Sequence, residues 1–139
     1  MTSVNKVMTS DVTSMTPTDS IAAAARAMSE LNVGVIPVCD AGKLLGVVTD
    51  RDIVIRAVAK GLDGQTPLSG IMSKQVQTAS PEDDLDDVLE RMADGQIRRM
   101  PVVNAEGGLV GIVSLGDIAV KGSEDEAEVG QSLGAISAP

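Results

Sequence analysis

The chain has 139 residues, of which 43% are hydrophobic, and 11 basic against 20 acidic residues give it a formal net charge of −9. This length suits about one domain of roughly 150 residues, and the negative charge argues against a nucleic-acid partner, because phosphate backbones bind basic surfaces. The sequence contains no Phe, Tyr, Trp or His. The core must therefore be aliphatic, and the absence of the commonest general base and metal ligand disfavours an enzyme or a metal site.

The sequence also favours a cytoplasmic protein that does not enter membranes. No apolar run approaches the roughly 18 residues of a membrane span, and the N-terminal stretch "MTSVNKVMTS" lacks the apolar core of a signal peptide. Cys39, the only cysteine, lies in the apolar run "VIPVC". It is predicted to be a buried, unreactive thiol.

The first half of the chain predicts one mixed unit of strands and helices. An initial strand is predicted around residues 12–15. A helix follows Pro17, where "TDSIAAAARAMSELN" has apolar residues at helical spacing and offers Thr18 or Asp19 as the N-cap. Two short strands, "GVIPVC" and "KLLGVV", are joined by a tight turn, and "DRDIVIRAVAKG" is predicted as a final helix.

The second half repeats this order. A shift of 64 residues aligns Met8 with Met72, Pro17 with Pro81 and Pro37 with Pro101, and after one extra turn residue a shift of 65 aligns Gly46 with Gly111 and Asp52 with Asp117. The repeat predicts an initial strand around residues 76–79, a helix in "EDDLDDVLERMADG", strands in "RMPVV" and "GLVGIV", and a final helix in "LGDIAVKG". The predicted domains are repeats at residues 1–61 and 71–122, a linker at 62–70, and a disordered acidic and small polar tail at 123–139.

The predicted fold class is α+β, with two pseudo-twofold related βαββα units packed through their sheets. Each unit has one apolar sheet face to cover, and its twin is the nearest cover, so the pair should form two equivalent clefts. Pro37 and Pro101 donate no hydrogen bond to a strand ladder, which places each at a strand start or a sheet edge. The methionines predicted to fill the core are Met8, Met28, Met72, Met92 and Met100.

Two copies of one pattern resemble the tandem CBS domains that form a Bateman module. The segments that carry the resemblance are "VMTSDVTSMTPTDSI" and "VIPVCDAGKLLGVVTDRDI" in the first repeat, and "IMSKQVQTASPEDDL" and "RMPVVNAEGGLVGIVSLGDI" in the second. The resemblance covers about Val4 to Lys121. It implies a regulatory module that, in many members, binds AMP, ADP, ATP or S-adenosylmethionine, and that often dimerises through its helices.

The resemblance also implies which residues would bind such a ligand. In the family, the Asp of the second motif holds the ribose hydroxyls, a nearby Thr or Ser meets phosphate, and aliphatic and backbone groups surround adenine. One site would use Thr49, Arg51 and Asp52 with Ser73, Val76 and Ile36. The other site would use Ser114 and Asp117 with Thr9, Val12, Arg98, Arg99 and Met100.

A structural reading of the same residues competes with the ligand reading. Thr49 with Asp52, and Ser114 with Asp117, fit the spacing of a helix capping box, with Asp in place of the usual Glu. Asp50 adds negative charge beside the first site, offset by Arg51 and Arg56, whereas Arg98 and Arg99 could reach a phosphate at the second. The sequence therefore favours the second site for a nucleotide, although the two arginines would also suit a solvated strand edge.

We interpret the chain as a stand-alone regulatory CBS pair, a homodimer, that binds an adenosine-containing ligand and signals to a partner protein. No cofactor is required in this interpretation, and AMP, ADP, ATP or S-adenosylmethionine would act as a regulatory ligand. The alternative is a structural or dimerisation module without a ligand, in which the Thr/Ser-x-x-Asp motifs only cap helices. The sequence names neither the ligand nor the regulated protein.

Overall fold

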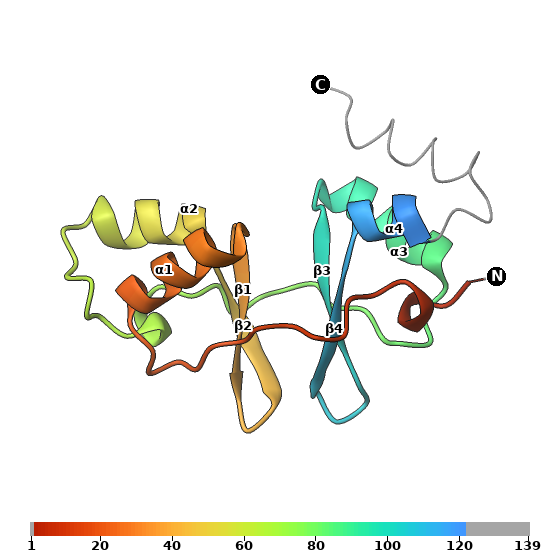
Figure 1. Cartoon of the computed structure of the whole chain (residues 1–139), viewed down its shortest axis with the longest axis horizontal. Coiled ribbons are helices and arrows are strands. Elements are labelled where there is room, and N and C mark those ends of the chain that lie inside the picture. Colours follow the sequence, from red (N-terminus) through yellow and green to blue (C-terminus); the bar gives the residue numbers. More distant parts are fainter. Residues whose placement is uncertain (1, 122–139) are drawn as a thin grey trace. The chain divides into compact units, whose positions relative to one another are not determined.

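The computed structural model describes residues 2–121 and divides into two compact units (Figure 1). The first unit is Thr13–Val76. The second unit combines Met1–Val12 with Gln77–Pro139, and its described parts are residues 2–12 and 77–121. The predicted mixture of helices and small sheets in two units is confirmed, whereas the packing of the units through their sheets stays a prediction.

The two units contain corresponding elements. The first unit comprises α1 (Ile21–Leu31), β1 (Val35–Asp40), β2 (Lys43–Thr49), α2 (Asp50–Asp52), the π-helical segment η2 (Ile53–Val58) and the 3-10 helix η3 (Leu68–Gly70). The second unit comprises the 3-10 helix η1 (Val4–Lys6), α3 (Leu85–Gly95), β3 (Arg99–Val103), β4 (Leu109–Ser114) and α4 (Leu115–Lys121). The predicted final helix of the first repeat is therefore one short α-helical turn that continues as a π-helix.

The N-terminus of α1 differs from the sequence prediction. Ser20, and not Thr18 or Asp19, is the N-cap, because its hydroxyl oxygen accepts the N–H of Ala23 at 3.1 Å. Asp19 instead accepts the N–H of Thr16 at 2.8 Å and closes the turn before the helix. The Asp19 side chain is thus engaged in the turn before the helix, and the hydroxyl of the next residue, Ser20, caps the helix.

Each unit is built around one antiparallel hairpin. β1 pairs with β2 from Val35 opposite Thr49 to Asp40 opposite Lys43, and β3 pairs with β4 in the corresponding register. Both sheets have two strands, so β1 and β3 are edge strands. Pro37 and Pro101 lie inside these edge strands, which agrees with the predicted sheet edge and not with a strand start.

The predicted initial strands are reduced to single bridging residues, so this part of the prediction is wrong. Met15 makes an isolated parallel bridge to Val38, and Ala79 makes the same bridge to Val102. At the first of these bridges, the N–H of Met15 bonds the carbonyl oxygen of Pro37 at 2.9 Å, and the N–H of Cys39 bonds the carbonyl oxygen of Met15 at 2.7 Å.

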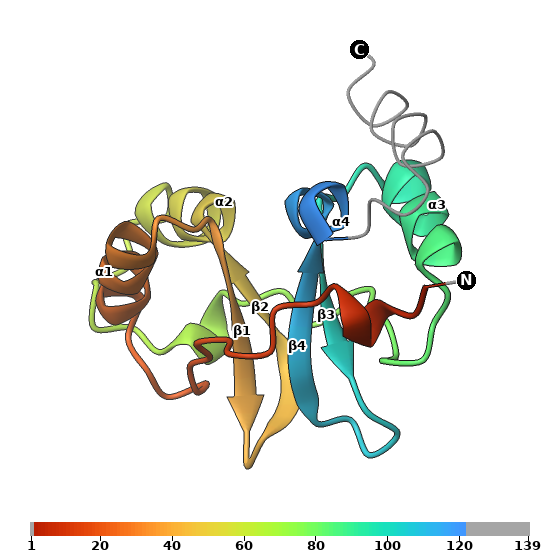
Figure 2. The same ribbon diagram turned by 45° about the vertical axis from the view of Figure 1, so that its right-hand side comes forward.

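In each unit, a short segment crosses the hairpin beside its second strand. We call it the crossing segment: it is the stretch around Ser73 in the first unit and the stretch around Thr9 in the second. In the first unit, Ser73 and Val47 exchange backbone hydrogen bonds of 2.8 and 2.9 Å; in the second, Thr9 and Ile112 do the same at 2.8 and 2.9 Å. Figure 2 shows the N-terminal segment running beside β4. The compact units therefore differ from the sequence repeats, because each includes the crossing segment that the sequence repeat assigns to the other copy.

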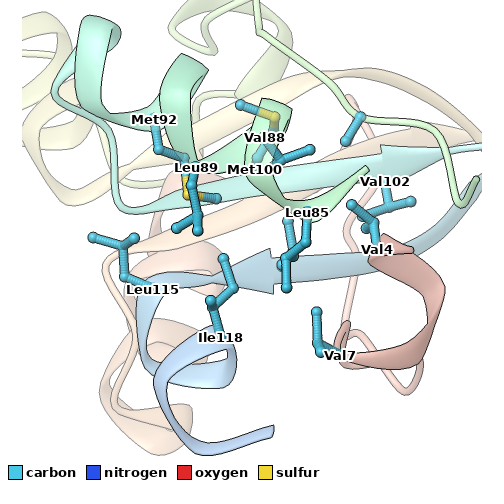
Figure 3. Close-up of a cluster of buried hydrophobic side chains, with 12 residues drawn as sticks. Val4, Val7, Leu85, Val88, Leu89, Met92, Met100, Val102, Leu115 and Ile118 are labelled. Atoms are coloured by element: carbon cyan, nitrogen blue, oxygen red, sulfur yellow. The ribbon is translucent and has the colours of Figure 1, made fainter. Parts of the chain in front are cut away.

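Each unit has its own aliphatic core. In the second unit, Leu85, Val88, Leu89 and Met92 of α3 pack against the hairpin, α4 and the N-terminal segment (Figure 3). The corresponding core of the first unit joins α1, the hairpin, η2 and Leu68. The methionine prediction is confirmed, since Met28, Met72, Met92 and Met100 are buried and Met8 packs against the core of the second unit.

The predicted linker is part of the first unit and is packed against it. The N–H groups of Ile21 and Ala22 bond the carbonyl oxygens of Thr66 and Gly64 at 3.0 and 2.8 Å, and Leu68 is fully buried. The tail at 123–139 lies outside the described residues. Within residues 2–121, no helix has the length and apolar character needed to cross a membrane.

Candidate functional site

The end of β2 carries the first predicted motif, and its capping box is complete. Thr49 is the N-cap of α2, and its hydroxyl oxygen accepts the N–H of Asp52 at 2.9 Å. In return, Oδ2 of Asp52 accepts the N–H of Thr49 at 3.0 Å. The helix-cap reading of "TDRD" is therefore confirmed, and it leaves the role of Asp52 in ligand binding open.

Residues of the crossing segment and of η2 both contact the carboxylate of Asp52. Asp52 is 8% exposed, and the hydroxyl of Ser73 lies 3.2 Å from both of its oxygens. Nε of Arg56 lies 3.7 Å from Oδ1, while another guanidinium nitrogen of Arg56 donates long bonds of 3.5 Å to the carbonyls of Ile71 and Met72. A buried charge thus has a cation and hydroxyl and amide donors around it, as burial requires.

The second unit has the corresponding hydroxyl cap and hydroxyl–carboxylate contact in a more open form. The hydroxyl oxygen of Ser114 accepts the N–H of Asp117 at 3.0 Å, which caps α4. The hydroxyl of Thr9 donates to Oδ2 of Asp117 at 3.2 Å, just as Ser73 donates to Asp52 in the first unit. Asp117 is half-buried, so its carboxylate is more accessible than that of Asp52.

The remaining residues predicted to bind a ligand differ in how deeply they are buried. Ile36 and Met100 are 1% and 0% exposed and belong to the two cores. Val76 and Val12 are half-buried, and Arg51 is exposed. Arg98 and Arg99 are exposed as well, and the carbonyl of Arg98 accepts the N–H of Leu115 at 3.0 Å.

The first unit contains a cleft that the sequence did not indicate. It has a volume of about 550 Å³ and lies beside Asp52, with residues from η2, η3 and the crossing segment around it. Its lining residues are Arg56, Ser69, Gly70, Met72, Ser73, Lys74 and Gln75. Two of them are cationic and none is acidic. A lone basic residue after "IMS" gives no pattern that could have identified Lys74 in advance.

The position of Asp50 alters the charge balance inferred from sequence. Its Oδ1 accepts the N–H of Arg51 at 2.8 Å, and its backbone N–H bonds the carbonyl of Gly34 at 3.0 Å. Asp50 does not line the cleft, whereas Arg56 and Lys74 do. The carboxylate nearest to this cleft is therefore that of Asp52, which lies 3.7 Å from Arg56 and 3.2 Å from Ser73.

Cys39 and the acidic side chains offer no further site among residues 2–121. Burial raises the pKa of the Cys39 thiol, and a hydrogen bond with Ser14 opposes that shift without cancelling it. The thiol is buried, as predicted, so it is protonated at neutral pH and a weak nucleophile. In this described part of the chain, no group of three His, Cys, Asp or Glu residues is arranged to hold a metal ion.

The comparison with known proteins agrees with the two repeats found in the sequence. The family model described as "CBS domain" matches residues 4–58 and again residues 68–123. The "CBS domain-containing protein YhcV" of Bacillus subtilis is 45% identical over 137 residues, which cover 99% of this chain and 96% of that protein. Both findings extend over nearly the full chain, as the resemblance of the two motifs predicts.

Solved structures agree with this result. The crystal structure of Hypoxic Response Protein I with two coordinated zinc ions is 35% identical, has a TM-score of 0.77, and covers 86% of this chain and 98% of that one. The CBS domain pair of protein MJ0100, in complex with 5′-methylthioadenosine and S-adenosyl-L-methionine, is 30% identical with a TM-score of 0.75, covering 86% of this chain and 94% of that one.

Proposed function

Because this chain belongs to the CBS domain family and contains two CBS domains, we propose that it is a regulatory module that binds an adenosine-containing ligand and signals to a partner protein. The ligand is AMP, ADP, ATP or S-adenosylmethionine. The module has no catalytic step, needs no cofactor and works in the cytoplasm. The crystal structure of the MJ0100 pair with two adenosine compounds supports this ligand class.

The observation that carries the proposal is the hydroxyl–carboxylate pair present in both units. Ser73 with Asp52, and Thr9 with Asp117, are brought together from distant parts of the sequence at distances of 3.2 Å. A helix cap needs only local residues, so capping does not explain why a hydroxyl from a crossing segment meets each carboxylate. A site for a ribose does explain it, because a ligand diol requires an acceptor fixed in position.

Each carboxylate also retains room for a ligand hydroxyl. A carboxylate has about four acceptor positions. Oδ2 of Asp52 accepts Thr49 N–H, and the single hydroxyl hydrogen of Ser73 is shared between both oxygens. Oδ1 therefore has a position for a ribose O–H, and the half-buried Asp117, with Thr9 on Oδ2, has at least the same capacity.

Ligand-dependent stabilisation tests the proposal. Ligand present at 100 times its Kd raises the free energy of unfolding by about 2.7 kcal/mol, which appears as an increase in Tm of several degrees. We expect this increase with at least one of AMP, ADP, ATP and S-adenosylmethionine. Asp52→Asn and Asp117→Asn retain a capping acceptor but lose the charged one, and each should weaken ligand binding, while the exposed Asp86→Asn serves as control.

The same measurements separate the proposal from its alternative. In a purely structural module, Asp52→Ala and Asp117→Ala would each lower stability by about 1 kcal/mol, as the loss of a cap does, and none of the four ligands would change Tm at millimolar concentration. That pattern would contradict the proposed function. Native mass spectrometry of the purified protein adds a direct check, because it reports a co-purified nucleotide and the oligomeric mass together.

We also propose that the chain forms a homodimer through its final helices. Val54, Ile55 and Val58 of the first unit are 59%, 44% and 69% exposed, and Val120, at the repeat position of Ile55, is 78% exposed. Apolar side chains at corresponding helix positions suit contact with a second copy. Light scattering should give a dimer that Val58→Asp dissociates, whereas Leu31→Asp, a similar change on α1, should leave it intact; a monomeric natural chain would refute this.

A zinc site like that of Hypoxic Response Protein I does not form part of the proposal. This chain contains no histidine and a single cysteine, and that cysteine is buried. These residues do not provide the usual tetrahedral set of nitrogen and sulfur ligands.

A further inference from the structure

Two stretches of the chain lead from a crossing segment into the other unit, and we call them tethers. The first tether is residues 10–14, and the second tether is residues 74–78. Neither tether contains a helix or a strand, and each lies between two bridging residues, Thr9 and Met15 in the first case, Ser73 and Ala79 in the second. Each tether therefore follows directly after the hydroxyl residue that meets a motif carboxylate.

The far end of the second tether is held by Arg91 of α3. One terminal nitrogen of its guanidinium group donates to the carbonyl oxygen of Thr78 at 2.9 Å, and the other lies 3.0 Å from Oδ2 of Asp83. The side chains of Arg91 and Asp83 are 39% and 37% exposed, and an ion pair in such a position adds little to stability. Its distinct effect is positional, because it joins the last residue of the tether to α3 and to the turn before that helix.

The first unit has the same turn without the arginine. Asp83 accepts the N–H of Ser80 at 2.9 Å, just as Asp19 accepts the N–H of Thr16 at 2.8 Å. At the shift of 64 residues, Arg91 aligns with Ala27. The turn thus forms without an arginine, and Arg91 adds a connection to the tether that the other repeat does not have.

The connection continues from Asp83 to the second motif carboxylate. The carbonyl oxygen of Asp83 accepts the N–H of Val4 at 3.0 Å. Five residues after Val4, Thr9 donates to Asp117 at 3.2 Å. A contiguous series of bonds therefore leads from Asp52 and Ser73, through the second tether and Arg91, to Asp117, and energetic coupling between two sites requires a network of this kind.

We propose that Arg91 is a positioning residue that couples the two candidate ligand sites. A change in how Ser73 is held at Asp52 passes along the second tether, and Arg91 carries it to the segment that holds Thr9. The first tether, which has no corresponding arginine, contributes less to the coupling. The inference rests on the proposed function for the ligands that would use this coupling, but the coupling itself is tested without a ligand.

The test is amide hydrogen exchange, followed by NMR, in the full chain. Ser73→Ala removes the hydroxyl bond to Asp52 and loosens the start of the second tether. Exchange should become about fivefold faster at Val4 and Asp83 in the second unit, which corresponds to the loss of about one hydrogen bond. The amide of Leu115, which bonds the carbonyl oxygen of Arg98 at 3.0 Å, should exchange at an unchanged rate, and this excludes a general loosening of that unit.

A double-mutant cycle assigns the effect to Arg91. In Arg91→Ala, which introduces the residue of the first repeat, the added Ser73→Ala change should cause no further acceleration at Val4 and Asp83. Glu90→Ala is the matched control, because Glu90 is exposed and adjacent in α3, and it should leave the response to Ser73→Ala intact.

Two other variants extend the comparison. Thr9→Val removes the corresponding hydroxyl bond to Asp117. It should have little effect on the amide of Leu68, which bonds the carbonyl oxygen of Asp19 at 2.9 Å as Val4 bonds that of Asp83. Gly46→Ala perturbs Ser73 more strongly, because its Cβ would overlap the carbonyl oxygen of Ser73, and it should give the pattern expected for Ser73→Ala.

The outcomes separate this inference from the proposed function. Unchanged exchange at Val4 and Asp83 in both Ser73→Ala and Gly46→Ala would overturn the coupling. An equal acceleration at Leu115, or a full response in the absence of Arg91, would overturn it as well. None of these results affects whether an adenosine compound raises Tm. Conversely, coupling through Arg91 in a chain that no adenosine compound stabilises would support this inference and refute the proposed function.

Discussion

Gly46 is the residue on which the geometry of the first unit depends most directly. It lies in β2 at the point where the crossing segment passes. A Cβ atom at this position would overlap the carbonyl oxygen of Ser73 and would lie 3.1 Å from the carbonyl carbon of Ser73 and 3.2 Å from Cα of Lys74. All three atoms belong to the backbone, so a side-chain rotation cannot relieve the contact. We therefore predict that Gly46→Ala displaces the crossing segment.

The cost follows from the bonds that this displacement breaks. The paired backbone bonds between Val47 and Ser73, of 2.9 and 2.8 Å, contribute about 1 kcal/mol each. The hydroxyl bond from Ser73 to Asp52 contributes about 1 kcal/mol more. The expected loss is about 3 kcal/mol of unfolding free energy, or a decrease in Tm of about 10 °C for a chain of this size.

Thermal unfolding followed by circular dichroism measures the loss, and hydrogen exchange at the amides of Val47 and Ser73 locates it. Gly70→Ala is the control, because a Cβ there would have no atom within 4 Å. Gly111→Ala should fall between the two, since its Cβ would meet both the flexible Sδ of Met8 and the carbonyl oxygen of Thr9 at 2.8 Å. If Gly46→Ala is no less stable than Gly70→Ala, the crossing segment does not pack as described.

Three further changes have defined outcomes. Thr49→Ala removes the acceptor for Asp52 N–H and should cost about 1 kcal/mol in urea denaturation, whereas Thr49→Ser should retain most of it. Burial raises the pKa of Cys39, so the folded chain binds the thiol proton more tightly than the unfolded chain does. The free energy of unfolding should therefore fall as pH rises above about 8.5. Cys39→Ala should remove that part of the pH dependence. Gly116→Ala in α4, whose nearest atom would lie 3.7 Å away, should raise Tm, with a gain of about 0.5–1 kcal/mol.

The repeat and the hydrophobic spacing predicted most of the fold. The helices α1 and α3, the hairpins and the aliphatic cores follow from patterns that are local and occur twice in the sequence. The lengths of the initial strands at Met15 and Ala79 were overestimated. The length of a strand depends on how many of its residues pair with a neighbouring strand. Each partner here meets the segment at one bridge only.

Two other features depend on three-dimensional context that the sequence pattern does not contain. The π-helical turns of η2 arise from bonds such as that from the N–H of Ala59 to the carbonyl of Val54, and such wide turns have no distinctive residue spacing. Three consecutive residues, Thr18, Asp19 and Ser20, are all good capping types. The choice of Ser20 depends on Asp19 being engaged by Thr16.

The sequence predicted several residues of the candidate site but not the cleft beside them. Pairing Ser73 with Asp52, and Thr9 with Asp117, came from the family resemblance, and the structure brings both pairs to hydrogen-bond distance. The cleft was missed because its cations, Arg56 and Lys74, come from two elements, η2 and the crossing segment, that are not adjacent in the sequence. The preference for the second site, inferred from the charges around Asp50, stays a prediction.

The two aspartates show how one repeated motif supports two different electrostatic environments. Both aspartates accept a hydroxyl from a crossing segment, but Asp52 is buried beside Arg56 while Asp117 is half-buried. A carboxylate that is already fixed by its neighbours loses little conformational freedom when a ligand binds. The hydroxyl cap is thus common to both units, and the residues around each carboxylate, above all Arg56 in the first unit, account for the difference between the two environments.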